Sequence, residues 1–151
     1  MKTQLVEFRF GRNINGTPMS LDRWAQFQAE ARAILDGVAT GLQAGSLEPL
    51  KQWTEVHTGT GTWVNEDGTV ESEDSAVVTL YTNASTLCTF TLRDTLVDFA
   101  AELATDYEQD AVAVVYAGES TLVSAKAVNE CDHEYEAYCP DCGIDSEEAA
   151  R

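Results

Sequence analysis

The chain has 151 residues, which suits a single domain that buries a core without help from disulfides. Its 26 acidic and 9 basic residues give a net charge of −17, and a field of that sign opposes binding to nucleic-acid phosphates and to anionic lipid surfaces. No segment approaches the roughly 20 apolar residues of a membrane-spanning helix, and the N-terminus lacks the apolar segment of a secretory signal, so we expect a cytoplasmic protein.

The first predicted element is a strand over residues 5–10, where apolar and charged side chains alternate. A turn-rich loop at residues 11–18 follows it. Ser20 is the expected N-cap of a helix whose apolar residues recur at three- and four-residue steps, and Gly37 and Gly41 are candidate stops of that helix.

The middle of the chain predicts a β-hairpin. Residues 53–63 form a threonine-rich strand, residues 65–68 form its turn, and the returning strand lies near residues 76–82. Gly59 and Gly61 lie inside the first strand and not between a strand and a helix, so they do not match a dinucleotide-binding fingerprint. We expect them to mark a bulge or the close approach of a neighbouring segment.

The last predicted elements are a helix and a strand. Thr91 and Asp94 form a capping box at the start of the helix, whose buried stripe continues to Tyr107. Residues 111–116 are a short valine-rich run that is typical of a central strand, and residues 121–123 add a short extension or an edge strand.

The order β-α-β-β-α-β predicts an α+β fold of the ferredoxin-like type, with a four-stranded antiparallel sheet and both helices on one face. This domain covers residues 1–126, and residues 127–151 form an appended acidic tail. Because an open sheet face often packs on a second copy, we expect a homodimer through it. That face is expected to hold Glu7, Arg9, His57 and Trp63, with Tyr81 and Val77 as further candidates.

Four residues of the tail have the spacing of a metal site, C-x-H-x₅-C-x₂-C: Cys131, His133, Cys139 and Cys142. Zinc takes four nitrogen or sulfur ligands in a tetrahedron, and two close pairs joined by a short loop supply them. The second pair, followed by Gly143, resembles a zinc-ribbon knuckle. We therefore predict a structural Zn²⁺, which contributes on the order of 10 kcal/mol to the folding of such elements. Idle thiols or an adventitious disulfide are the alternative.

Four protein ligands leave no position for water, so this site disfavours metal-based catalysis. It disfavours nucleic-acid binding as well, because six carboxylates surround the ligands and three thiolates make the metal centre negative. Tyr135 and Tyr138 are expected to pack the knuckle against the domain or to face a protein partner.

Other candidates for chemistry are weaker. Cys88 is alone in a threonine-rich segment, which is typical of a buried or idle thiol. His57 lies within a strand and has no serine or cysteine beside it, so we interpret it as a sheet-face residue. Arg12 and residues 13–16 fall where acylphosphatases carry their phosphate-binding loop, but the glycine and glutamine pattern of that family is missing.

Several segments carry a resemblance to a known family: residues 8–13 (FRFGRN), 19–24 (MSLDRW) with Phe27, 59–63 (GTGTW), Gly68 and 107–111 (YEQDA). Over about residues 5–117 the chain resembles a family of small uncharacterised domains of actinobacteria and their phages. The resemblance implies a ferredoxin-like fold and a phage accessory protein, and it implies no activity. The zinc tail is outside the pattern.

These features favour a non-enzymatic interaction protein of the cytoplasm, encoded by a phage, with a structural zinc site and an unidentified protein partner. Three alternatives stay open: an acidic mimic of nucleic acid that inhibits a DNA-binding protein, a small acylphosphatase-like hydrolase, and a virion component. The negative charge also fits a plain role in solubility.

Overall fold

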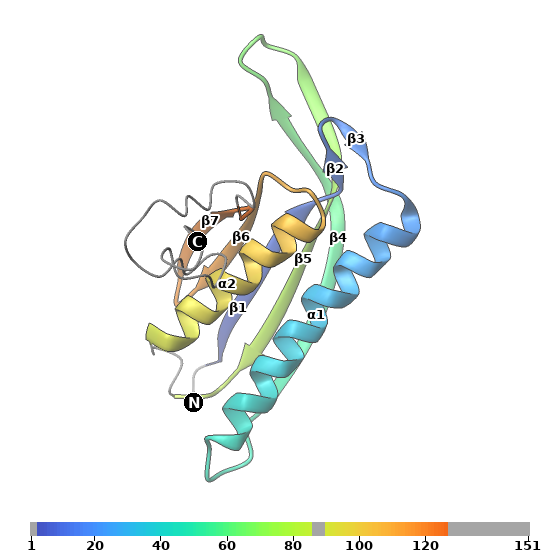
Figure 1. Ribbon diagram of the computed structural model, residues 1–151. Coiled ribbons are helices and arrows are strands. Elements are labelled where there is room, and N and C mark those ends of the chain that lie inside the picture. Colours follow the sequence, from blue (N-terminus) through green and yellow to red (C-terminus); the bar gives the residue numbers. More distant parts are fainter. Residues whose placement is uncertain (1–2, 86–89, 127–151) are drawn as a thin grey trace, which may run out of the picture.

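The computed structural model describes residues 3–85 and 90–126. Within them, two helices cover one face of a five-stranded antiparallel sheet with the strand order β4-β5-β1-β6-β7 (Figure 1). Helix α1 packs on β4 and β5, and helix α2 packs on β6 and β7. In chain order the elements are β1 (Gln4–Gly11), β2 (Asn13–Ile14), β3 (Thr17–Pro18), α1 (Leu21–Ala44), β4 (Gln52–Val64), β5 (Val70–Thr82), α2 (Phe90–Asp106), β6 (Ala111–Tyr116) and β7 (Glu119–Ser124).

The α+β class and the placement of both helices on one face are confirmed, whereas the expected four strands are five. The fifth is β7, which confirms the edge-strand alternative for residues 121–123 and extends it to Glu119–Ser124. A two-residue loop joins it to β6: Ala117 and Gly118 both have positive φ, at 51° and 82°. Such a loop has the twist of a tight hairpin. The sequence did not predict this turn, because its first residue is alanine and not the asparagine, aspartate or glycine that such turns favour.

Helix α1 begins as expected but runs further. The Ser20 side chain accepts a hydrogen bond from the Arg23 backbone N–H at 3.2 Å, which confirms the N-cap. The expected stops at Gly37 and Gly41 are wrong, because the helix passes through both and ends at Ala44, with Gly45 as its C-cap. A glycine inside a helix costs only about 1 kcal/mol relative to alanine. The buried stripe of α1 is long enough to offset two of them.

The β4–β5 hairpin is longer and more regular than expected. Its turn is confirmed, with hydrogen bonds from Asn65 N to Thr69 O (2.8 Å) and from Gly68 N to Asn65 O (2.9 Å). The expected bulge at Gly59 and Gly61 is wrong, because both glycines pair in an unbroken ladder and no neighbouring atom approaches them. Strand β5 starts at Val70, ahead of the expected start at residue 76.

A stack of aromatic rings forms the part of the core near the C-terminal end of β1. The Phe27 ring lies between those of Phe10 and Tyr107, with centroid distances of 3.9 Å and 4.3 Å and interplanar angles of 14° and 3°. Trp24 meets Phe27 edge-on at 6.0 Å. Because these rings come from α1, β1 and the end of α2, the stack joins the helix layer to the sheet.

Several sequence predictions lie outside the described residues. They include Cys88 and the whole tail with Cys131, His133, Cys139 and Cys142, while the side chains of Thr91 and Trp63 are not described either. Among the described helices, none has the length and apolar character needed to cross a membrane.

Replacing Phe27, which is fully buried, with alanine tests the stack. We expect Phe27→Ala to lower the free energy of unfolding by about 3–5 kcal/mol, because it removes two stacked contacts and leaves a cavity. Urea denaturation followed by circular dichroism measures the change. The control Leu47→Ala removes a fully exposed side chain and should change stability by less than about 0.5 kcal/mol. Equal effects of the two substitutions would contradict this account of the core.

Candidate functional site on the open sheet face and the β4–β5 ribbon

The sheet face opposite the helices is the first candidate surface. The pairing register places on it every second residue of each strand, and no described helix packs there (Figure 1). Its side chains mix apolar groups with a few ionisable ones. They are Leu5, Glu7 and Arg9 from β1, Trp53, Glu55 and His57 from β4, Val77, Thr79 and Tyr81 from β5, Ala113 and Val115 from β6, and Leu122 from β7.

The carboxylate of Glu55 is the centre of a polar cluster on this face. It accepts hydrogen bonds from Trp53 Nε1 (3.3 Å) and from the Tyr81 hydroxyl, and His57 Nε2 lies 2.9 Å from its Oε2. The Trp53 and Tyr81 rings stack at 4.8 Å. The contact with His57 holds the pKa of Glu55 below its usual value, whereas burial and the Glu55 charge raise the pKa of Tyr81. The cluster therefore keeps a fixed negative charge among two aromatic rings.

A second carboxylate, Glu7, is nearly buried on the same face. Its Oε2 accepts from Arg9 Nε at 2.8 Å and from Arg9 Nη2 at 2.6 Å, and its Oε1 accepts from Thr79 Oγ1 at 3.2 Å. Two donors of Arg9 thus share one Glu7 oxygen, and this ion pair compensates the carboxylate charge on the sheet face. Among the described residues, the hydroxyl partners of these two carboxylates are Thr79 on Glu7 and Tyr81 on Glu55.

The loop after β1, where a phosphate-binding loop was considered, is occupied by the chain's own groups. The Arg12 guanidinium donates to the carbonyl of Met19 (2.9 Å) and to the Asp74 carboxylate (2.8 Å). The Asn13 backbone N–H donates to Glu73 Oε2 at 2.8 Å. An anionic substrate in this loop would have to displace Glu73 and compete with Asp74 for the arginine.

Sequence reasoning missed Glu73, because its partner Asn13 lies 60 residues away in the chain. One local signal was present, the glycine at the end of the first strand. A Cβ at Gly11 would overlap the Glu73 carboxylate, so a larger residue there would require the flexible end of the Glu73 side chain to shift from Asn13.

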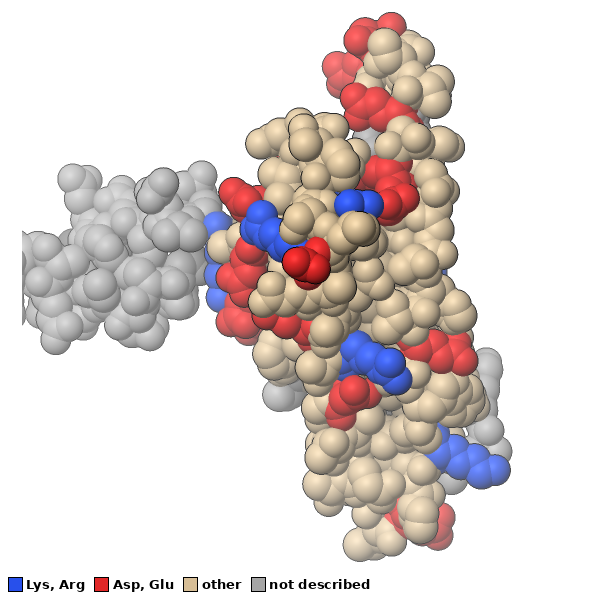
Figure 2. Space-filling view, turned by 90° about the vertical axis from the view of Figure 1, so that its right-hand side faces the viewer, with Lys and Arg blue, Asp and Glu red and all other residues tan. Residues whose placement is uncertain are grey.

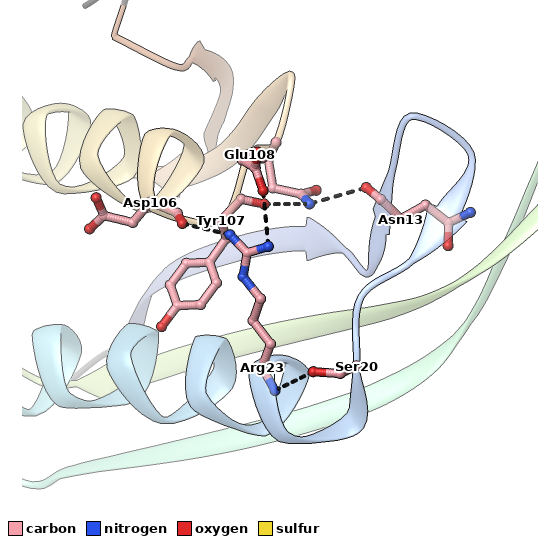
Figure 3. A network of polar contacts seen from close by, with 7 residues as sticks. Asn13, Ser20, Arg23, Asp106, Tyr107 and Glu108 are labelled. Atoms are coloured by element: carbon pink, nitrogen blue, oxygen red, sulfur yellow. Dashed lines mark hydrogen bonds and ion pairs between the residues drawn. The ribbon is translucent and has the colours of Figure 1, made fainter.

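A hydrogen-bond network holds the β1 loop, α1 and the α2–β6 turn together (Figure 3). Arg23 donates to the Glu108 carboxylate and to the carbonyl of Asp106, both at 2.9 Å. Gln109 donates to the carbonyl of Asn13 at 3.1 Å. Tyr107 lies within this network, and burial, followed by its hydrogen bond with Glu30, raises its pKa to about 12. The network therefore fixes the position of the loop after β1.

The second candidate surface is a ribbon formed by the outer ends of β4 and β5. Strand β1 pairs with β5 only as far as Gly11↔Ser75, whereas β4 and β5 remain paired out to Val64↔Val70. Residues 60–74, called here the β4–β5 ribbon, therefore extend beyond the rest of the sheet as two strands and a turn (Figure 1).

The β4–β5 ribbon combines negative charge with an exposed apolar tip. It contains five carboxylates and no lysine or arginine, and Figure 2 shows acidic side chains along it. The paired Val64 and Val70 near the turn are 67% and 69% exposed. These two valines are side by side in the ladder, and none of the described side chains of residues 60–74 is buried.

No metal site is formed by the described part of the chain: across residues 3–85 and 90–126, no group of three or more His, Cys, Asp or Glu side chains is placed to hold an ion. The predicted zinc ligands Cys131, His133, Cys139 and Cys142 all lie beyond these residues.

Comparison with protein-family models and with curated proteins finds no match. Two solved structures are similar in shape. A phage SAM lyase in complex with S-methyl-5′-thioadenosine has a TM-score of 0.46 and 15% identity, covering 83% of this chain and 92% of that chain. A phage SAM lyase in the apo state has a TM-score of 0.44 and 15% identity, covering 81% and 89%. Likeness at this level transfers neither a fold nor an activity to this chain.

The contacts of Arg12 predict a structural role for this side chain. Arg12→Ala should lower the free energy of unfolding by about 1–2 kcal/mol, because the carbonyl of the buried Met19 loses a charged donor and the partly exposed ion pair with Asp74 adds little. Urea denaturation measures it. Arg32→Ala is the matched control, since the hydrogen bond that Arg32 donates within residues 3–85 and 90–126 is an exposed one of 3.2 Å to Thr54, and its loss should be nearly neutral. An Arg12→Ala protein as stable as the wild type would contradict the assignment.

Proposed function

We propose that this chain is a non-enzymatic interaction protein that binds a basic protein partner through the β4–β5 ribbon. We further propose that a phage encodes it, that it acts in the host cytoplasm, and that its tail folds around a structural zinc ion. The phage origin is supported by the sequence resemblance of residues 8–111. A ferredoxin-like fold with an added edge strand is proposed as well, supported by the strand order β4-β5-β1-β6 and by the two helices on one face.

The observation that carries the proposal is the β4–β5 ribbon itself. Its base is held by Arg12 on Asp74 and by the Asn13 N–H on Glu73, so two of its five carboxylates are engaged by groups outside the ribbon, and a third, Asp67, accepts from Thr69 in the turn. The remaining acids, with the exposed valine pair, form a surface that complements a cationic groove with an apolar floor. A second acidic chain is a poor partner for this element, because like charges would face each other.

The same charge pattern supports a more specific version, in which the partner is a DNA-binding protein and the ribbon competes with nucleic acid for its cleft. The hydrolase alternative has less support, because Arg12 and the Asn13 N–H are already engaged by carboxylates. Turnover of an acyl phosphate, lost in Arg12→Ala, would revive it. Detection of the protein in purified particles would establish a virion component.

Binding to purified cationic proteins tests the ribbon. The probes are a histone-like DNA-binding protein, a nuclease and RNA polymerase, each measured by biolayer interferometry at 50 mM and 300 mM NaCl. We expect one of them to bind, to bind more weakly at the higher salt, and to lose about tenfold or more in affinity with Glu66→Gln/Glu71→Gln and with Val64→Ser/Val70→Ser. Asp67 stays, because it accepts from Thr69 and holds the turn.

The matched control is Glu48→Gln/Glu119→Gln, which removes the same charge from two exposed positions away from the ribbon. Its affinity should change by less than about threefold. If all probes fail to bind at 50 mM NaCl, or if this control weakens binding as much as the ribbon variants do, the ribbon is not the docking element. Added DNA that displaces the chain from the bound probe would favour the nucleic-acid mimic.

The zinc proposal has its own test. Untagged, reduced protein should contain about one zinc per chain by elemental analysis, and Cys139→Ser should lower this content strongly because a tetrahedral site loses one of four ligands. Cys88→Ser is the matched control and should leave the content unchanged, since Cys88 is the one cysteine outside the predicted site. A metal content near zero in the wild type, or one that Cys139→Ser leaves intact, removes the site.

A further inference from the structure

We propose that the open sheet face is the surface through which two copies of this chain associate. The proposal uses residues of β1, β4, β5, β6 and β7 on the face opposite the helices, and none of the tip residues of the β4–β5 ribbon. It is therefore independent of the proposed binding to a basic partner, and both surfaces can be occupied at the same time.

The exposed apolar side chains of the open sheet face support the proposal that another protein surface packs on it. Three large apolar side chains on it are exposed in the described structure, namely Leu5 (40%), Trp53 (47%) and Leu122 (75%). Val77 and Val115, which lie between them in the register, are partly exposed. These apolar groups lie on five adjacent strands, with the Glu7–Arg9 pair of β1 and Thr79 of β5 among them, and a cover would remove them from water.

The distribution of charge indicates that the cover is a second copy. Eighteen acidic and seven basic residues lie in the described part, yet only two of these carboxylates, Glu7 and Glu55, belong to the open face as defined above. Both are already engaged: Glu7 by Arg9, and Glu55 by His57, Trp53 and Tyr81. Two such faces bring little net charge together, because Glu7 pairs with Arg9 and the Glu55 carboxylate has three hydrogen-bond partners, although the chains repel each other elsewhere.

The size of the face is adequate. Five strands spaced about 4.8 Å apart, each contributing about seven residues at roughly 3.3 Å, give a flat area on the order of 550 Å². Because side chains project from the sheet, the accessible area is larger than this flat area and approaches the roughly 800 Å² per partner of a standard stable interface. A two-fold arrangement uses the same patch twice, so each copy covers the other's stacked Trp53 and Tyr81 rings and the Glu55 cluster.

Sedimentation velocity of the full chain, from 1 to 100 µM in 150 mM NaCl, tests this proposal. We expect a concentration-dependent shift to the mass of two chains. Leu122→Arg and Trp53→Arg should each raise the dissociation constant about tenfold or more, because each places a charge in an apolar contact. The matched control is Leu47→Arg, which adds the same charge at a fully exposed loop position and should leave the dissociation constant within about threefold.

Circular dichroism melting shows whether each variant is folded, and Leu122→Ser replaces Leu122→Arg if the latter is not. A wild type that remains monomeric at 100 µM overturns the proposal. So does a dimer that tolerates both Leu122→Arg and Trp53→Arg, or one that Val64→Arg in the β4–β5 ribbon dissociates instead.

Discussion

The pairing of β1 with both of its neighbours is the constraint on which the other features depend. Every second residue of β1, such as Phe8, points into the core under the helices, and the residues between them, such as Glu7, point to the open face. The ladder between β1 and β5 ends at Gly11↔Ser75, and Arg12 closes it by donating its backbone N–H to the carbonyl of Asp74 and its guanidinium to the Asp74 carboxylate. Everything beyond that point of β4 and β5 has no third strand. The end of one short strand thus produces the ribbon.

Charge is divided unevenly between the two candidate surfaces. On the open face, Glu7 and Glu55 are satisfied by groups of their own sheet, which leaves that face nearly neutral and partly apolar. On the β4–β5 ribbon, carboxylates outnumber their internal partners and surround the pair Val64 and Val70. The open face has little net charge and is partly apolar, so it suits contact with a second copy of this acidic chain. The β4–β5 ribbon is acidic with an apolar tip, so it suits a basic partner.

The loop after β1 shows how local sequence and long-range contact combine. Its composition of glycine, arginine and asparagine is typical of a loop that binds an anion, and the loop does bind one, the side chain of Glu73. This carboxylate belongs to the β4–β5 ribbon, so the same contact fixes both the loop after β1 and the base of the ribbon. Gln109 holds the loop from the opposite side through the carbonyl of Asn13. These internal contacts give the loop after β1 a structural role in place of ligand binding.

The sequence by itself determined the features that depend on neighbours in the chain. Alternation in residues 5–10, the cap at Ser20 and the turn at Gly68 were all predictable, because periodicity, capping and turn chemistry act within a few residues. The zinc ligands are also a local pattern and remain a prediction from spacing alone. Tertiary structure decided the rest. Residues 70–75 have no apolar alternation and form a strand because β4 pairs with them, and Glu73 reaches Asn13 because folding joins positions far apart in the sequence.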